Sequence, residues 1–231
     1  MGDSGAARVS VVIPALDAVT TLPACLDALG DREDLLGEVV VADGGSTDGT
    51  PDLAARRGCR VVTGAAGRGR QLRAGADAAG CDWLLFLHAD TRLGNGWAEI
   101  VRAFVADPAH RDRAGVFRLA YDRDTPAARR VAGWANRRTR WLGLPYGDQG
   151  LLIHRRTYDR LGGFPDVPLM EDVMLMRRLG RRRIRVLDAV AVTSAARYDR
   201  DGWWARPLRN LSILSLHLLG VGPQRLKRWY G

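Results

Sequence analysis

Residues 83–91 have the sequence Trp83-Leu84-Leu85-Phe86-Leu87-His88-Ala89-Asp90-Thr91, an apolar run that ends at a carboxylate. Five consecutive apolar residues indicate a parallel strand buried on both faces, because a strand with one face in water would alternate apolar and polar residues. Open α/β sheets bind their ligands beyond the carboxyl ends of such strands. Asp90 therefore stands where a carboxylate could hold a divalent cation against a diphosphate, and capping of a following helix is the structural alternative.

Strand and helix patterns alternate before this buried strand. Thr50 followed by Pro51 is typical of a helix start, with the threonine at the cap and the proline in the first turn. The alternation favours an α/β fold with a doubly wound, mainly parallel sheet flanked by helices. Strands are predicted over residues 9–13, 38–42 and 60–63, and helices over residues 22–29, from residue 50 onward and over residues 70–79.

The pattern becomes more mixed after about residue 106. This change divides the expected domain, residues 1–200, into a nucleotide-binding half over residues 1–106 and an acceptor-binding half over residues 107–200. In the second half, strands are predicted over residues 114–121 and 150–154, and helices over residues 126–141 and 168–179.

Residues 201–231 form a distinct amphipathic helical tail, in which leucines recur among arginines and tryptophans stand near both ends. Its apolar run is too short and too interrupted to span a bilayer. We expect the tail to pack on the core, and contact with a membrane surface through residues 203–230 is the alternative.

The 231-residue chain is 46% hydrophobic and carries a formal net charge of +9, with Lys227 as its only lysine. Such a surface attracts phosphates and acidic lipids, but no recognition helix, zinc-finger spacing or aromatic RNA-binding pattern accompanies the charge, so nucleic acid is not expected as a partner. Cys25, Cys59 and Cys81 have no paired spacing and suit a reducing compartment. Because residues 1–8 lack an apolar signal-peptide core, we expect a cytoplasmic protein, with a peripheral position on the inner face of the cell membrane as the alternative.

Four segments lie in order along the chain. They are VSVVIPA at residues 9–15, EVVVADGGSTDGT at residues 38–50, His88-Ala89-Asp90 after the buried strand, and Gly162-Gly163-Phe164 followed by Met170-Glu171-Asp172. Together they resemble the family-2 glycosyltransferases of the GT-A fold, and most of all a small single-domain bacterial subgroup with a His-Ala-Asp-Thr metal motif. The resemblance covers nearly the whole chain, including residues 146–150 and the tail, and implies a GT-A (Rossmann-like) sheet.

The resemblance implies a nucleotide-sugar site at the carboxyl edge of this sheet. Asp43 would accept the imide N–H of uracil or a ribose hydroxyl, and a turn closed by its own carboxylate is the structural alternative. Arg68 and Arg70 precede a predicted helix and suit diphosphate oxygens, and the resemblance favours Arg68. The full expected set is Pro14, Ala15, Asp43, Gly45, Ser46, Arg68, Arg70, His88, Ala89 and Asp90.

The same resemblance implies Mn²⁺ or Mg²⁺ bound by Asp90, with His88 as the second candidate ligand. A divalent cation stabilises the negative charge that grows on a departing diphosphate. Many relatives carry Asp-x-Asp, whereas this chain has His88 at the first position. His88 could therefore bind the metal, contact ribose or phosphate, or only pack.

Asp172 is the expected general base, ahead of Glu171. It would take the proton of the acceptor hydroxyl as that oxygen attacks the anomeric carbon from the face opposite the diphosphate, so the anomeric configuration inverts. Adjacent helix residues point roughly 100° apart, so one of the two acids faces the sugar. Placement of both acids for the helix macrodipole is the structural alternative. Asp148, Gln149 and Gly163 would line the acceptor or sugar side.

We therefore expect an inverting, metal-dependent glycosyltransferase that moves one sugar from a nucleotide-diphosphate sugar, UDP-linked in preference to GDP-linked, to an acceptor hydroxyl. The acceptor could be lipid-linked, a glycan or a small metabolite. A sugar-phosphate nucleotidyltransferase is an alternative, although residues 14–17 offer no basic glycine-rich loop to cradle a triphosphate. A non-catalytic basic module that binds nucleotide-sugars or nucleic acid is the other.

Overall fold

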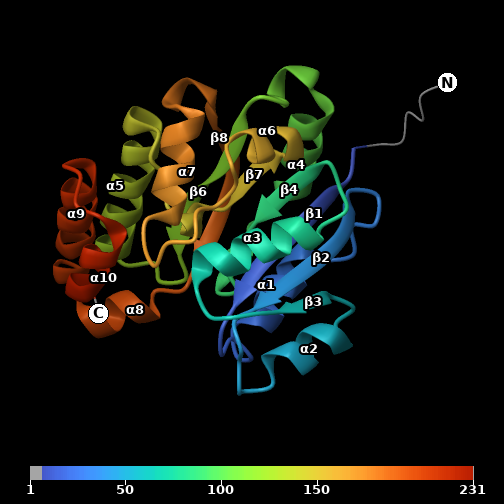
Figure 1. Ribbon diagram of the computed structural model, residues 1–231, viewed down its shortest axis with the longest axis horizontal. Coiled ribbons are helices and arrows are strands. Elements are labelled where there is room, and N and C mark those ends of the chain that lie inside the picture. Colours follow the sequence, from blue (N-terminus) through green and yellow to red (C-terminus); the bar gives the residue numbers. More distant parts are fainter. Residues whose placement is uncertain (1–6, 231) are drawn as a thin grey trace.

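The structure, a computed structural model, describes residues 7–230, so the first six residues, on which part of the localisation expectation rests, lie outside it. The described chain forms one mixed sheet with helices on both faces (Figure 1). Its strands are β1 (Val9–Ala15), β2 (Leu36–Asp43), β3 (Arg60–Thr63), β4 (Trp83–Phe86), β5 (Thr91–Leu93), β6 (Ala114–Tyr121), β7 (Leu151–His154) and β8 (Ile184–Thr193). Its helices are α1 (Leu22–Leu29), α2 (Thr50–Arg56), α3 (Arg68–Ala78), α4 (Trp97–Ala106), α5 (Pro126–Leu142), α6 (Arg155–Arg160), α7 (Glu171–Leu179), α8 (Ala196–Asp201), α9 (Ala205–Leu218) and α10 (Pro223–Tyr230), with 3₁₀ turns η1 (Pro108–His110), η2 (Gly147–Gln149) and η3 (Arg181–Arg183).

The first half of the chain forms a doubly wound parallel sheet, as predicted. β1 pairs in parallel with both β2 and β4, and β3 extends the sheet beyond β2. The full strand order is β3-β2-β1-β4-β7-β6-β8-β5. The carboxyl ends of β1 and β4 therefore lie side by side at a point where the winding reverses, which is where such sheets bind ligands.

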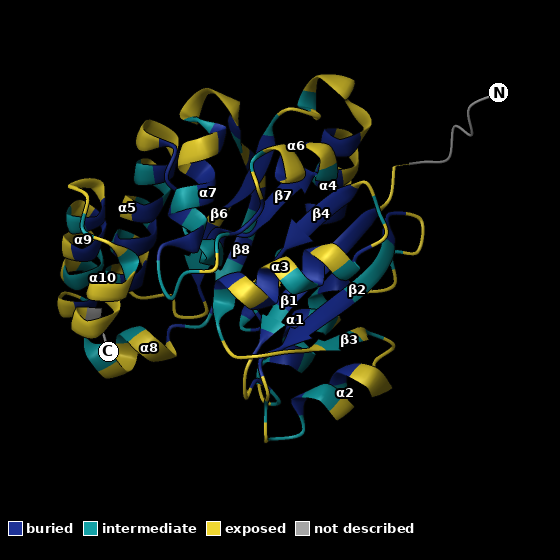
Figure 2. Cartoon of the chain, in the orientation of Figure 1, coloured by how far each residue is buried: buried dark blue, intermediate teal, exposed yellow. Residues whose placement is uncertain are grey.

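β4 is the buried central strand that the sequence predicts. Its four residues are at most 3% exposed. Trp83 and Leu85 pack with α1 and α4 on one face, while Leu84 and Phe86 pack with α3 and α7 on the other. Burial on both faces explains the unbroken apolar run, and the buried strands stand out as a dark layer between exposed helices (Figure 2).

The second half adds strands that make the sheet mixed. β7 runs antiparallel between β4 and β6, and β8 runs parallel to β6. β8, β5 and α4 were not predicted from the sequence. β8 pairs with β6 through an irregularity beside Val116, and this shifts the buried positions of β8 from Ile184 to Leu187 and so breaks the period of two.

The predicted helix over residues 168–179 is wrong at its start. α7 begins at Glu171, because Met170 has a φ of 68° in the left-handed region and cannot continue a helix. The two acids therefore occupy the first turn of α7, where unpaired backbone N–H groups favour negative charge.

The tail packs on the core, as expected. Ile213 and Leu214 of α9 and Leu226 of α10 are buried against Met170 and Val173 at the start of α7. Among residues 7–230 no helix combines the length and apolar character needed to cross a bilayer. The tail therefore packs as part of the domain, against the start of α7.

Candidate functional site

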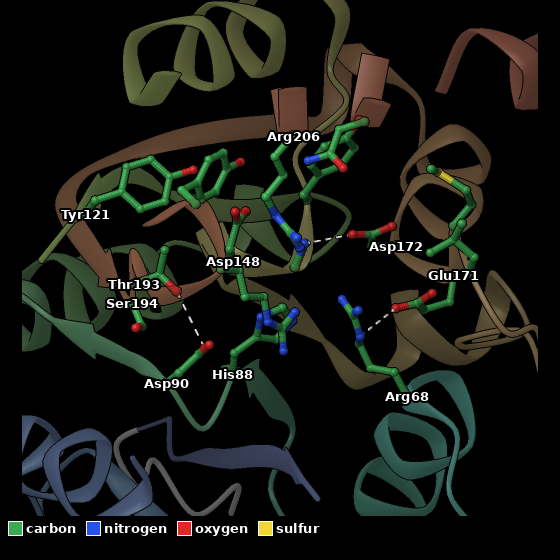
Figure 3. A pocket seen from close by; sticks show the side chains of 17 residues that line it. Arg68, His88, Asp90, Tyr121, Asp148, Glu171, Asp172, Thr193, Ser194 and Arg206 are labelled. Atoms are coloured by element: carbon green, nitrogen blue, oxygen red, sulfur yellow. Dashed lines mark hydrogen bonds and ion pairs between the residues drawn. The ribbon is translucent and has the colours of Figure 1, made fainter. Parts of the chain in front are cut away.

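A pocket opens at the carboxyl edge of the sheet, beyond the ends of β4, β6 and β8 (Figure 3). Loops after these strands, the turn η2 and the first turn of α7 all contribute to it. α8 and α9, the second of which belongs to the tail, close another side of the pocket. The charged residues of its lining are the acids Asp90, Asp148, Glu171 and Asp172 and the arginines Arg68, Arg197 and Arg206.

Asp90 is held at the rim by its own backbone. The Thr91 N–H donates to the His88 carbonyl at 3.1 Å, and the Ser194 N–H donates to the Asp90 carbonyl at 3.2 Å. The Asp90 Oδ1 atom lies 3.5 Å from the Thr193 hydroxyl (Figure 3). None of the ion pairs within residues 7–230 involves Asp90, so its carboxylate is available to a ligand.

His88 lies between Asp90 and η2, with its ring against Gly147. A Cβ atom on Gly147 would sit 2.5 Å from the His88 Nε2 atom, so only glycine leaves room for the ring. This Nε2 atom is buried and has no hydrogen-bond partner in the described chain. Burial, together with the charges of Arg68 and Arg197, holds the pKa of His88 well below its usual value. The imidazole is therefore neutral, the form that binds metals.

Glu171 and Asp172 have different partners. Glu171 is buried, and one of its oxygens lies 3.3 Å from the Arg68 Nε atom. Burial raises its pKa, the charge of Asp172 adds to the rise, and Arg68 opposes it. Asp172 accepts instead from the Gly147 N–H at 2.8 Å and so faces η2 across the pocket. The two acids point in different directions, as expected for adjacent helix residues.

Asp148 and Gln149, adjacent in η2, lie on opposite sides of the pocket wall. The buried Oδ1 atom of Asp148 has no partner among the described residues, and burial raises the pKa of Asp148 to about 6. Gln149 is buried outside the pocket, where it accepts from the Thr139 hydroxyl at 2.6 Å and donates to the Phe117 carbonyl at 3.1 Å. Gly163 also lies outside the lining and forms a turn with a φ of 64°.

A groove continues the pocket toward the nucleotide-binding half. Its walls are residues 14–18 at the end of β1 and just beyond it and residues 66–68 at the start of α3, and Lys227 of α10 reaches its edge. Pro14, Ala15 and Ala89 belong to this lining. Arg68, His88, Asp90 and Arg197 line both the groove and the pocket, which makes them one continuous cavity.

The turn after β2 lies next to this groove but does not line it. The Asp43 carboxylate accepts from the Gly45 N–H at 2.9 Å and from the Ser46 N–H and hydroxyl, so it closes its own turn. Asp43, Gly45 and Ser46 do not line the groove. This arrangement matches the structural alternative for Asp43. Arg70 is exposed and pairs with Asp166 at 2.6 Å, outside the groove.

Several lining residues were missed. Thr193 ends β8, Ser194 follows it and Arg197 belongs to α8, and neither of these elements was predicted. Arg206 and Asn210 belong to α9, within the predicted helical tail, but the tail was not expected to reach the site. The Thr193-Ser194 pair after an apolar strand could have been found, had the shifted period of β8 been recognised. Gln71 was also missed, although its amide donates to the Ala15 and Ala42 carbonyls at 2.6 and 3.0 Å and so joins the ends of β1 and β2.

The cavity fits a cation that arrives with a phosphate ligand. Within residues 7–230 no three His, Cys, Asp or Glu side chains lie close enough to hold a metal ion by themselves. Asp90 offers a carboxylate that accepts a 3.5 Å hydrogen bond from the Thr193 hydroxyl, and His88 offers a neutral imidazole with an unpartnered nitrogen. Mg²⁺ in nucleotide sites commonly uses one or two carboxylates, and substrate phosphates and water complete its shell.

Comparisons with known proteins converge on one family. A sequence profile described as "Glycosyl transferase family 2" matches residues 10–162. Over 91 residues the chain is 38% identical to PGL/p-HBAD biosynthesis glycosyltransferases of Mycobacterium bovis and Mycobacterium tuberculosis. That match spans 36% of this chain and 36% of those proteins, or about a third of their length.

Solved structures of low sequence identity share the fold. The mannosyltransferase PcManGT from Pyrobaculum calidifontis, in complex with GDP-Man and Mn²⁺, superposes with a TM-score of 0.58 and 22% identity over 80% of this chain and 56% of that one. Residues 1–349 of S. aureus TarS, in complex with UDP, give a TM-score of 0.59 and 17% identity over 81% of this chain and 61% of that one. Both likenesses support the GT-A fold predicted from the sequence.

Proposed function

Since this chain belongs to glycosyl transferase family 2, we propose that it transfers one sugar from a nucleotide-diphosphate sugar to an acceptor hydroxyl. One arrangement carries the proposal: four acids face a pocket that continues into a groove edged by Arg68, Arg197 and Lys227. The groove lies beyond the carboxyl ends of β1 and β4, where doubly wound sheets bind nucleotides. We assign the groove to the donor nucleotide and the pocket to the reacting sugar and the acceptor.

The donor diphosphate would lie between Asp90 and the two arginines that line both parts of the cavity. The guanidinium groups of Arg68 and Arg197 match the geometry of phosphate oxygens. Asp90, with His88 beside it, would hold Mn²⁺ or Mg²⁺, which supplies charge stabilisation to the departing diphosphate. Relatives solved with UDP and with GDP-Man and Mn²⁺ support this kind of donor. A UDP-sugar is our first candidate and a GDP-sugar the second.

Asp172 would act as the general base in a single displacement. Its hydrogen bond from the Gly147 N–H orients the carboxylate toward the pocket. The acceptor oxygen forms a bond to the anomeric carbon and gives its proton to Asp172, while the bond from that carbon to the diphosphate oxygen breaks. Because the base and the leaving group lie on opposite sides of the sugar, the anomeric configuration inverts.

The nucleotidyltransferase alternative has less support. Such an enzyme needs a basic loop around a triphosphate after its first strand. Here Asp17 occupies that loop, and its carboxylate accepts from the Thr47 N–H at 2.9 Å. An acidic side chain fixed in this loop would repel a triphosphate.

Release of nucleoside diphosphate tests the proposal. Purified protein should release UDP from a UDP-sugar, or GDP from a GDP-sugar, when Mn²⁺ and a candidate acceptor are present, as the sugar passes to the acceptor hydroxyl or, more slowly, to water, and a chelator should stop the release. A thermal-shift screen of nucleotide-sugars with Mn²⁺ first selects the donor. Absence of any metal-dependent shift or release across the panel would contradict both the donor and the metal assignment.

Substitution of Asp90 tests the metal assignment more directly. Asp90→Ala should abolish the Mn²⁺-dependent part of UDP binding in calorimetry, because it removes the carboxylate proposed to hold the cation. Asp188→Ala is the matched control, since its side chain is 89% exposed and lies on β8 away from the cavity. Equal Mn²⁺-dependent affinities for the two variants would remove Asp90 as the metal ligand.

A further inference from the structure

α9 has two faces that meet different surroundings. Its inner face carries the buried Ile213 and Leu214, and Arg206 and Asn210 reach the catalytic pocket. Its outer face carries the uncharged stripe Trp204, Leu208, Leu211 and Leu218, and the first three of these residues are each 57% exposed. Exposed residues are visible along the outer side of α9 and α10 (Figure 2). Large apolar side chains in a helical stripe are normally buried, so the exposure of this face indicates a binding surface.

α5 extends this apolar face. Trp134 and Trp141 lie two turns apart on one side of α5 and are 45% and 60% exposed, and Leu142 beside them is 58% exposed. The Trp134 ring contacts the Trp204 ring at the start of α9, with centroids 6.2 Å apart. We call the combined surface the apolar platform; it comprises Trp134, Trp141, Leu142, Trp204, Leu208, Leu211 and Leu218.

The elements that carry the platform are strongly basic. α5 and residues 202–230 together contain ten basic residues and no acidic residue. α5 also forms one wall of a groove whose single acid, Asp188, pairs with Arg118. The groove reaches the platform at the end of α5, because Gly143, next to Leu142, packs directly on the backbone of Arg181. The arginines of this groove are Arg118, Arg137, Arg140, Arg181, Arg182 and Arg185.

We propose that the apolar platform and its basic surroundings dock on the surface of an anionic lipid bilayer. Tryptophan and leucine side chains would enter the interface between headgroups and acyl chains, and the arginines would contact lipid phosphates. Charge complementarity selects this partner over a second copy of the chain, because two such basic faces repel each other. A nucleic acid would satisfy the arginines but would leave the leucine stripe in water.

Docking does not depend on the proposed sugar transfer, but it has a geometric link to the cavity. The helix whose outer face carries the stripe is the one whose inner face lines the pocket, so the bilayer would lie one helix diameter, roughly 10 Å, from the reacting groups. An acceptor hydroxyl near the lipid headgroups could then reach the pocket without leaving the membrane surface.

Vesicle cosedimentation tests the docking. The full chain should bind vesicles of phosphatidylcholine and phosphatidylglycerol in equal parts, with weaker binding at high salt, and should bind phosphatidylcholine alone far less. L208Q/L211Q should lower the partition coefficient by at least about tenfold, because two leucines no longer enter the interface. R137Q/R140Q should lower it roughly fivefold for each charge removed.

Two matched controls separate docking from general effects. L208M/L211M keeps an apolar stripe and should bind like the parent chain. R56Q/R57Q removes the same charge from the end of α2, on the opposite side of the molecule (Figure 1), and should also bind like the parent chain. If L208Q/L211Q fails to fold by circular dichroism, W134Q replaces it.

Three results would overturn the proposal. The parent chain could ignore the anionic vesicles, or the L208Q/L211Q and R137Q/R140Q variants could bind as tightly as their controls. Sedimentation velocity could also show a dimer of the parent chain that L208Q/L211Q dissociates, in which case the platform is an interface between copies.

Discussion

Arg68 separates the roles of the two neighbouring acids at the start of α7. The Arg68 Nε atom lies 3.3 Å from a carboxylate oxygen of Glu171. Asp172 is oriented instead by the hydrogen bond that it accepts from the Gly147 N–H. Arg68 also lines the groove that we assign to the donor, so under the proposed function Glu171 would act on the donor side through this arginine and Asp172 would serve the acceptor. A pair that looks redundant in the sequence is thus divided by its contacts.

Conservative variants of this pair should have different kinetic effects. Asp172→Asn should slow single-turnover transfer by roughly 10²–10⁴-fold with little change in UDP affinity, because it would remove the proposed general base. Glu171→Gln should chiefly weaken UDP binding, because Arg68 loses the charge that holds it. Single-turnover rates and calorimetry distinguish the two effects. A larger loss of rate in Glu171→Gln than in Asp172→Asn would reverse the assignment.

Asp148 should make stability depend on pH. Its pKa rises from 3.8 to about 6 in the folded protein, mainly through burial, so folding favours the protonated form. The ionised form therefore destabilises the fold by up to roughly 3 kcal/mol above about pH 6, and this cost disappears below about pH 4. Asp148→Asn should raise the melting temperature at about pH 8 and leave it nearly unchanged at about pH 4.

An exposed acid provides the control for this measurement. Asp77 lies on the solvent side of α3, and Asp77→Asn should change the melting temperature little at either pH. If Asp148→Asn stabilises the protein equally at both pH values, burial of its charge is not the cause.

The sequence located the acids of the site better than their partners. Asp90 and Arg68 were expected at the nucleotide-sugar, Asp172 or Glu171 as the general base, and Asp148 on the acceptor or sugar side, and the structure brings all five to one cavity. Their elements begin or end at recognisable turns, so local pattern and family resemblance were sufficient. The turn that the Asp43 carboxylate closes was the structural alternative given for it, whereas the contacts of Gln149 could not be predicted, because Thr139 and the Phe117 carbonyl lie on other elements.

At the scale of elements, α3 approaches the sheet so closely that it needs glycine. A Cβ atom on Gly75 would lie 2.4 Å from the Val12 Cγ1 atom of β1. The same helix supplies Arg68 and Gln71, which reach the donor groove and the ends of β1 and β2. The close packing of α3 therefore sets the position of the groove wall.

Gly75→Ala should destabilise the protein even though alanine is the better helix former. Overpacking against Val12 should cost about 1–3 kcal/mol in urea unfolding, and donor affinity should fall as α3 shifts. Gly133→Ala on α5 is the matched control, because its added Cβ would meet nothing closer than 3.9 Å and should stabilise by about 0.5–1 kcal/mol. Destabilisation by both substitutions to the same extent would show that packing on β1 is not responsible.

Elements with a regular period were predictable and the others were not. β4 was predictable from its unbroken apolar run. The alternation of strand and helix patterns around it predicted the doubly wound first half of the sheet. β8 was not predicted, because its buried positions shift where its pairing with β6 is irregular. Such a shift depends on the partner strand, so no local sequence pattern indicates it. The start of α7 was missed because a methionine rarely adopts the left-handed conformation of Met170.

At the scale of the whole molecule, the tail returns to cover the start of α7. Leu226 of α10 is fully buried in a cluster with Met170 and Val173, next to the two acids. The last elements of the described chain thereby support residues in the middle of the sequence. No periodicity in residues 201–231 could have revealed which surface they cover.

Leu226→Ala should therefore affect both stability and transfer. The cavity should cost about 2–5 kcal/mol, and the loosened start of α7 should lower the transfer rate at temperatures where the protein remains folded. Leu219→Ala is the control, because Leu219 is 81% exposed and its truncation should change stability by less than about 0.5 kcal/mol. Thermal unfolding together with initial rates below the transition measures both effects. Normal transfer in a clearly destabilised Leu226→Ala protein would separate the tail from the active site.

The outward stripe of α9 also has a practical consequence. Hydrocarbon that faces water will make the purified protein adhere to plastic and chromatography resins and limit the concentration at which it stays in solution. Crystallisation and assay development should therefore begin with polar replacements on that outer stripe. Such replacements leave the side of α9 that lines the pocket unaltered.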